Sequence, residues 1–127
     1  MKDMSQIKNK SINVILVSHT LHHIRNSDIK KIIENFYRIL TDDGIIILKE
    51  HNCISKEFGK LLDIQHMLYD TVISQISTYD SYIEKFYSNY KSIKEWNNLF
   101  KDFKVVKFID LKGYDKSYIS IYKKNII

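Results

Sequence analysis

The sequence is poor in glycine and cysteine and has no long hydrophobic run. Its three glycines, Gly44, Gly59 and Gly113, are isolated from one another, so no loop of successive glycines can bring backbone amides close to a ligand. The single cysteine, Cys53, excludes an intrachain disulfide and cannot by itself make a zinc-finger ligand set. The apolar runs are far too short to span a bilayer, and the lysine-rich start does not resemble a signal peptide. We therefore expect a soluble cytoplasmic protein with no membrane partner.

The length and composition are those of one domain. At 127 residues the chain has too little material for a second core, so residues 1–127 are assigned to a single domain. Hydrophobic residues make up 44% of the sequence, which is enough for a core. The formal net charge is +5 and the pI is near 9.2, but the lysines are spread along the chain without a dense run. The charge permits a nucleic-acid partner without favouring one.

A buried strand followed by a helix is predicted near the start of the sequence. Residues Ile12 to Val17 form a nearly continuous β-branched run, which is typical of a central strand buried on both faces of a parallel sheet. From Ser27, which is placed to cap a helix, the apolar residues recur at helical spacing. These apolar positions are Ile29, Ile32, Ile33, Phe36, Ile39 and Leu40. We therefore expect a helix that ends near Leu40.

A turn and a second strand complete a βαβ unit. Thr41 to Gly44 supplies the turn, in which Gly44 is expected to adopt a positive φ. Ile45 to Leu48 forms a second apolar strand. The length of the connection predicts that the two strands pair in parallel through a right-handed crossover.

The second half of the sequence predicts further helices and a hairpin. A helix is expected from about Lys56 to Ser77, and aromatic residues then recur at three- and four-residue spacing from Tyr79 to Tyr90. At that spacing they are more typical of packing than of a substrate wall or a surface that stacks on bases. Ser92 is placed to cap another helix. Two strand candidates, Lys104 to Leu111 and Ser117 to Lys123, are predicted to form an antiparallel hairpin.

Three motifs follow one another in an order known from one family. Leu21-His22-His23 comes after the first predicted strand, and the segment from Arg38 to Gly44 fits an Arg-x-Leu-x-x-x-Gly approach to the second. The segment from Tyr90 to Trp96 fits a Tyr-x-Ser-x-x-x-Trp element. From about Ile12 to Lys123 the chain thus resembles the class I S-adenosylmethionine-dependent methyltransferases, beginning at their fourth strand.

The resemblance implies an α/β fold: a partial Rossmann-like sheet of about four strands, the last one antiparallel, with helices on both faces. The family's glycine-rich loop and the acidic residue that holds the cofactor ribose are both missing, so the sequence looks like the C-terminal half of the domain. We therefore expect S-adenosylmethionine to bind only in an assembled or complemented form. The first strand would have an unpaired edge, which predicts a partner chain or self-association through Val14 to Val17.

The turn after the first strand holds the candidate cofactor-binding residues. Ligands bind outside the carboxyl ends of strands in open α/β sheets, and the resemblance implies that this turn faces the methionine part of the cofactor. The residues concerned are Ser18, His19, Leu21 and His22. Capping of the turn and packing are the alternative roles. The neighbouring histidines also suggest metal ligands, but no carboxylate or thiol cluster accompanies them in the sequence, so we expect no metal site.

The candidate catalytic residues come from the second strand end and the next helix. Glu50 and His51 end the second strand, where either could orient or deprotonate a methyl acceptor, although a solvated strand end is an equally good interpretation. Asp63 and His66 share one face of the following helix as a candidate acid–base pair, with a surface ion pair as the alternative. Cys53 has nothing nearby in sequence to lower its thiol pKa.

Three hypotheses for function follow from the sequence. The leading one is an incomplete methyltransferase-like protein that needs a partner chain to bind its cofactor. The second is a non-catalytic interaction or regulatory remnant of that fold. The third and weakest is a small basic nucleic-acid-binding module that uses tyrosine and lysine side chains.

Overall fold

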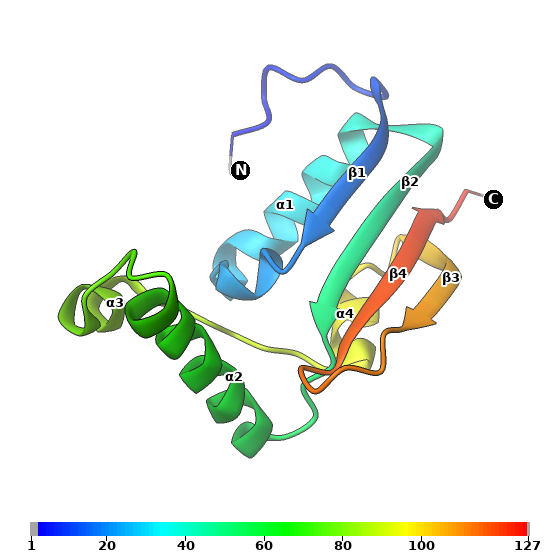
Figure 1. The fold of residues 1–127 in the computed structure, drawn as a ribbon. Coiled ribbons are helices and arrows are strands. Elements are labelled where there is room, and N and C mark those ends of the chain that lie inside the picture. The colour runs from blue at the N-terminus through cyan, green and yellow to red at the C-terminus, as the bar shows by residue number, and fades with distance from the viewer. Residues whose placement is uncertain (1–2, 127) are drawn as a thin grey trace.

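A computed structural model describes residues 3–126, which form a four-stranded mixed sheet flanked by helices (Figure 1). The strand order across the sheet is β1-β2-β4-β3, with β1 parallel to β2 and the other two pairs antiparallel. The strands are β1 (Ile12–Ser18), β2 (Leu40–His51), β3 (Phe103–Asp110) and β4 (Ser117–Lys124). The α/β class, the parallel βαβ unit and the final antiparallel hairpin are thereby confirmed.

The helices fall into two groups. In Figure 1, α1 and α4 lie against the sheet, whereas α2 and α3 form a separate group beyond the end at which β1 and β2 finish. A short 3₁₀ segment, η1, lies between β1 and α1, and a short π segment, η2, lies between α2 and α3. The bounds are η1 (Leu21–His23), α1 (Asn26–Ile39), α2 (Lys56–Leu68), η2 (Tyr69–Ile73), α3 (Tyr79–Lys85) and α4 (Ile93–Leu99). No helix in the range 3–126 is long and apolar enough to cross a membrane.

The hydrophobic core lies between the sheet and the α1–α4 layer. The predicted apolar stripe of α1 is buried along its whole length, because its residues recur on the face that meets the sheet. Trp96 of α4 is fully buried, and Phe100 stacks on Tyr122 of β4 with ring centroids 4.6 Å apart. These contacts hold the end of α4 against β4.

The opposite face of the sheet carries exposed apolar side chains. Val14 and Leu16 of β1 are 53% and 69% exposed, and Ile109 of β3, which pairs with Ile119 on the same face, is 37% exposed. Figure 1 shows no helix over this face in the described part of the chain. The sequence predicted helices on both faces of the sheet. In the structure α1 and α4 are the helices that pack on the sheet, and both lie on the same face.

Strand β1 occupies an edge and not the centre of the sheet. Within residues 3–126 its only strand partner is β2. Its apolar run therefore buries Val17 against α1 but leaves Leu16 in solvent. The prediction of a central strand is therefore wrong for residues 3–126. A run that is apolar on both faces indicates a strand suited to burial, but it does not show that a second neighbouring strand is present.

Gly44 is needed for close packing and not for a positive φ. No described glycine has a positive φ, and Gly44 lies inside β2, where the register passes from Ile12 opposite Leu40 to Val14 opposite Ile45. A Cβ atom at Gly44 would lie 2.6 Å from Cδ1 of Leu40, which is itself fully buried. The predicted turn is thus an irregularity within one long strand.

One of the two predicted helix caps is confirmed, and one predicted helix end is not. Ser27 does not cap α1: the helix begins at Asn26, after Arg25, and no side chain caps it. Ser92 does cap α4 and forms a capping box with Glu95. The helix predicted to reach Ser77 leaves α-helical geometry after Leu68 and ends with the π segment η2.

Candidate functional site

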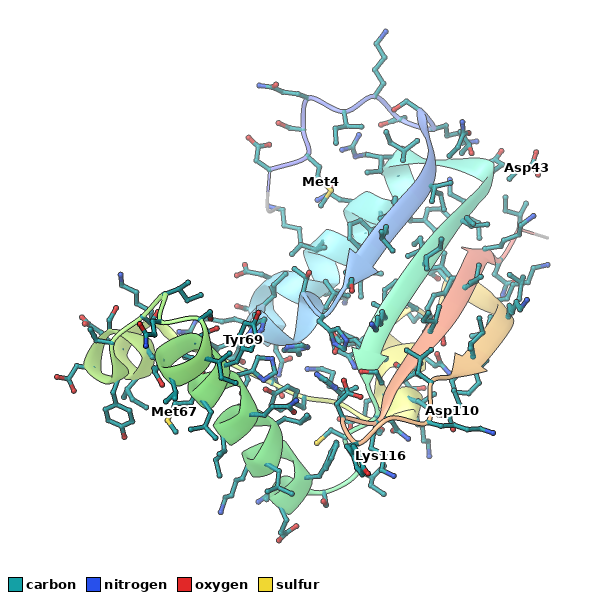
Figure 2. The ribbon with its side chains drawn as sticks, in the orientation of Figure 1. Met4, Asp43, Met67, Tyr69, Asp110 and Lys116 are labelled. Atoms are coloured by element: carbon teal, nitrogen blue, oxygen red, sulfur yellow. The ribbon has the colours of Figure 1, made fainter. Side chains whose placement is uncertain are left out.

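All five histidines of the sequence gather where β1 and β2 end. The ring centroids of His19 and His51 are 4.4 Å apart, and those of His22 and His51 are 5.4 Å apart. His66, from α2, has its ring centroid 5.6 Å from that of His22. Figure 2 shows Tyr69 on the side of the helical group that faces these strand ends, with Lys116 in the connection along the same end of the sheet. The cluster is completed by His23, whose ring centroid is 4.1 Å from that of His22.

The chain reaches this cluster through a tight turn. His19 has φ of 49°, a left-handed conformation that non-glycine residues seldom adopt, and its backbone N–H donates to the Lys49 carbonyl at 2.9 Å. The turn then passes into η1, where Leu21 is fully buried in the core and His22 is buried beside it. The turn thus aims the His19 and His22 rings at the end of β2.

Glu50 organises the centre of the cluster. One carboxylate oxygen, Oε1, accepts from Nδ1 of His22 at 2.7 Å and from the backbone N–H of His51 at 3.2 Å. The other, Oε2, accepts from the backbone N–H of His22 at 3.3 Å. The side chains of His22 and Glu50 are 0% and 1% exposed. Glu50 is therefore fixed by three hydrogen bonds, which is unlike the solvated strand end considered from the sequence.

The start of β4 supplies the remaining polar partners. Nδ1 of His51 donates to the backbone carbonyl of Asp115 at 2.7 Å. The Ser117 hydroxyl donates to Oδ2 of Asp115 at 2.8 Å and lies 3.3 Å from Nε2 of His19, which donates to it. Sequence reasoning missed Asp115 and Ser117, because Ser117 lies 98 positions from His19 and no motif links them. Only the insertion of β4 beside β2 brings them together.

Burial favours the neutral form of three imidazoles of the cluster. Desolvation, together with a smaller contribution from the nearby His51, lowers the pKa of His19 to about 4. Burial likewise lowers the pKa of His51, although the hydrogen bond to Asp115 opposes the change. Burial also lowers the pKa of His23. At neutral pH these three rings therefore each keep one nitrogen with a free lone pair.

A pocket of about 440 Å³ opens beside the cluster. His19, His51 and His66 line it together with residues of the helical group, Gln65, Leu68, Tyr69 and Ile73, and with Asp115. The pocket has a mostly apolar wall on one side and imidazole nitrogens on the other. Such a lining suits a small molecule that has an apolar body and one polar group.

The other candidate residues separate into those near the pocket and those away from it. Asp63 and His66 do not form the expected pair: Asp63 accepts from the Ser88 hydroxyl at 2.6 Å, and Nδ1 of His66 donates to the Leu62 carbonyl at 2.7 Å. Only His66 reaches the pocket. Ser18 is exposed at the end of β1, and its carbonyl accepts from the Thr20 hydroxyl. Leu21 packs in the core and offers no side-chain contact to a ligand.

Comparison with known proteins finds similarities to methyltransferases. A family model described as a methyltransferase domain matches residues 1–48. A protein from Sulfolobus solfataricus described as a type 11 methyltransferase is 19% identical, with a TM-score of 0.65, and the match covers 100% of this chain and 58% of that one. The chain is therefore similar in fold to methyltransferases.

Two further solved structures support this fold. An S-adenosylmethionine-dependent methyltransferase from Methanosarcina mazei is 16% identical, with a TM-score of 0.66 over 97% of this chain and 63% of that chain. The mitomycin 7-O-methyltransferase MmcR is 14% identical, with a TM-score of 0.63 over 96% and 32% respectively. No curated protein matches the sequence. The chain therefore spans less than two thirds of the length of each of these structures. Its resemblance to class I methyltransferases is confirmed at the level of the fold.

The described residues do not fit a complete S-adenosylmethionine site. Gly44 lies inside β2, Gly59 inside α2 and Gly113 between β3 and β4, so none follows the carboxyl end of a parallel strand. No glycine of residues 3–126 is therefore placed to bring backbone amides close to such a cofactor. The contact between the turn from Ser18 to His22 and its methionine part stays a prediction.

Proposed function

We propose that this chain provides the C-terminal half of an S-adenosylmethionine-dependent methyltransferase, and that a further polypeptide segment supplies the glycine-rich cofactor loop. The methyltransferase fold and the family match support the class of protein. The structures it resembles contain substantially more chain than it does. The chain thus holds the acceptor side of the site, and the missing segment holds the cofactor.

The unpaired edge of β1 is the observation that carries this proposal. β1 pairs only with β2 among residues 3–126, and its outward side chains Val14 and Leu16 remain exposed. Unpaired strand amides and carbonyls beside exposed apolar side chains are a ready template for another strand. We assign this edge to a strand of the segment that carries the cofactor loop.

The clustered residues suggest distinct roles on the acceptor side. Glu50 is buried and fully engaged by hydrogen bonds, so it acts as a positioning residue for His22 and His51 and not as a base. His66 borders the pocket and donates through Nδ1 to Leu62, so its Nε2 keeps the lone pair. His66 is therefore the residue we assign to accept a proton from a bound acceptor.

Calorimetry with S-adenosylmethionine tests the proposal. The purified chain is expected to give no binding heat at micromolar cofactor, because its residues do not cradle the ligand. A chimera that joins the part of the Sulfolobus solfataricus protein outside the match to this chain at Ile12 is expected to bind the cofactor. Micromolar binding by the chain alone would show that its cofactor site is not missing.

A methyl-transfer assay on the same chimera distinguishes a catalytic role from the non-catalytic interpretation. If a folded chimera binds the cofactor but transfers no methyl group to small-molecule, protein or RNA acceptors, the chain is a remnant of the fold. Replacement of His66 by glutamine in an active chimera is expected to lower kcat with little change in cofactor affinity, because the ring borders the pocket that we assign to the acceptor.

A further inference from the structure

Three of the clustered histidines present their ring nitrogens to one another. In His19, His22 and His51, one ring nitrogen of each residue lies within 4.8 Å of a ring nitrogen of the other two. His22 and His51 are buried, and His19 is half-buried. The three rings come from two adjacent parallel strand ends, so the sheet itself sets their spacing.

In each of these rings one nitrogen lies within hydrogen-bond distance of an oxygen atom of the protein. His22 donates through Nδ1 to the Glu50 carboxylate, and His51 donates through Nδ1 to the Asp115 carbonyl. His19 donates through Nε2 to the Ser117 hydroxyl, whose own proton goes to Asp115. In the neutral tautomer that donates to these oxygens, the opposite nitrogen of each ring carries the lone pair. Metal-bound histidines show the same pattern, with the outer N–H held by a carboxylate, a carbonyl or a comparable acceptor.

Two of these inner nitrogens are buried without a partner. Nε2 of His22 and Nδ1 of His19 are buried and make no hydrogen bond within the described chain, and the His22 side chain is 0% exposed. Buried polar atoms are nearly always satisfied, so an unpaired lone pair in this position requires a reason. A cation shared by the rings would supply one.

We propose that His19, His22 and His51 bind one divalent first-row transition metal ion, with Zn²⁺ the best match. Imidazole nitrogens favour Zn²⁺, Cu²⁺ and Ni²⁺, whereas Mg²⁺ and Ca²⁺ favour oxygen ligands. A tetrahedral zinc site needs ligand nitrogens about 3.3 Å apart, as follows from Zn–N bonds of about 2.0 Å, so small ring rotations complete the site. Glu50 holds the His22 ring from behind.

The remaining coordination position faces the pocket. His19 and His51 line that pocket, so a fourth ligand there is a water molecule or an oxygen atom of a bound compound. Three histidines with one open position are typical of zinc sites that act on a ligand. A second grouping, His22 with His23 and His66, shares the single free nitrogen of His22 and includes the exposed His23, so it does not hold a second ion at the same time.

This site does not depend on the proposed methyltransferase function, because it is formed wholly by residues of the chain described here. Its test therefore uses the metal alone. The purified full chain is stripped with a chelator and titrated with Zn²⁺ against a chromophoric competitor, and with Co²⁺ by visible spectroscopy. One bound ion per chain, a four-coordinate Co²⁺ spectrum and a raised Tm are expected.

Matched variants locate the ligands. His51→Gln and His19→Gln are each expected to weaken Zn²⁺ binding by more than about 100-fold, since loss of an outer-shell partner alone costs about 10- to 100-fold. Glu50→Gln keeps an oxygen acceptor for His22 and is expected to weaken binding by about 10- to 100-fold. His23→Gln is the control and should leave affinity unchanged. Circular dichroism establishes that each variant is folded.

Three results would overturn the assignment. The first is no binding of Zn²⁺ or Co²⁺ by the wild-type chain, which removes the site whatever the variants do. The second is full affinity in a folded His51→Gln chain. The third is loss of binding in His23→Gln with retention in His19→Gln, which would move the ion to the other histidine grouping.

Discussion

His22 and Glu50 form a nearly dry pair, with Nδ1 of His22 lying 2.7 Å from Oε1 of Glu50 and the two side chains 0% and 1% exposed. The pair joins the turn after β1 to the end of β2, which lie 28 positions apart in the sequence. Because Glu50 also accepts two backbone N–H groups, it fixes the turn and the strand end at once. The geometry of the histidine cluster therefore depends on one carboxylate.

Replacement of Glu50 by alanine is expected to destabilise the chain by about 3 kcal/mol. The change leaves the Nδ1–H of His22 and two backbone N–H groups without their acceptor in a buried place, and each unsatisfied group costs about 1–3 kcal/mol. Urea denaturation followed by circular dichroism measures the loss. Glu84→Ala, at an exposed position of α3, should change stability by less than about 0.5 kcal/mol. Equal losses in both variants would rule out the special role of Glu50.

Leu16→Lys is expected to shift the chain towards the monomer. Leu16 is 69% exposed on the open face of the edge strand β1, and a lysine there opposes pairing with another strand. Sedimentation or gel filtration over a range of concentrations should show self-association of the wild type that the variant lacks. Leu61→Lys, at a 62% exposed position of α2, serves as the matched control and should elute like the wild type. A wild-type chain that stays monomeric at every concentration contradicts the prediction.

Two glycine-to-alanine changes should affect the free energy of unfolding in opposite directions. At Gly44 a Cβ atom would lie 2.6 Å from Cδ1 of the fully buried Leu40, so Gly44→Ala is expected to cost about 1–3 kcal/mol through overpacking. At Gly59 the nearest atom would be Sγ of Cys53 at 3.5 Å, an ordinary contact inside α2. Gly59→Ala is therefore expected to stabilise by about 0.5–1 kcal/mol, because alanine favours the helix. Thermal unfolding of both variants provides the comparison.

Ser92→Ala should destabilise the chain by about 1 kcal/mol. The Ser92 hydroxyl accepts from the backbone N–H of Glu95, and the Glu95 carboxylate accepts from the backbone N–H of Ser92. Ser27→Ala is the informative control, because Ser27 lies inside α1 and makes no cap there. Chemical denaturation should show a change of less than about 0.5 kcal/mol for Ser27→Ala. A larger loss at Ser27 than at Ser92 would mean that the helix starts are assigned wrongly.

Much of the fold was predictable from local pattern. The apolar stripe of α1 and the capping box of α4 are both written in residues within a few positions of each other, and both are present. Local pattern failed where two sites offered similar signals. Ser27 fits a cap as well as Ser92 does in sequence, but α1 begins one residue before it, at Asn26. The role of Gly44 was also misread, because close approach to Leu40 cannot be told from a need for positive φ without coordinates.

The candidate site was only half predictable. The rule that ligands bind at the carboxyl ends of parallel strands led to His19, His22, Glu50 and His51, and the structure brings these four together. The same reasoning paired Asp63 with His66 from helical spacing, yet each bonds to a different partner, Ser88 and Leu62. We expected no metal site because no suitable ligands lie beside the histidines in the sequence. Ser117, Asp115 and the clustering of all five histidines become visible only in the structure.

By itself the sequence determined the α/β class, the βαβ unit, the final hairpin and the likeness to methyltransferases, because periodicity and short motifs act through neighbours along the chain. The tertiary structure alone decided that β1 is an edge, that one sheet face stays open, and that three imidazoles bring ring nitrogens within 4.8 Å of one another. Those features depend on β4 inserting beside β2 and on α2 lying at the strand ends. Contacts between residues as far apart as His19 and Ser117 are set by packing, which no local pattern encodes.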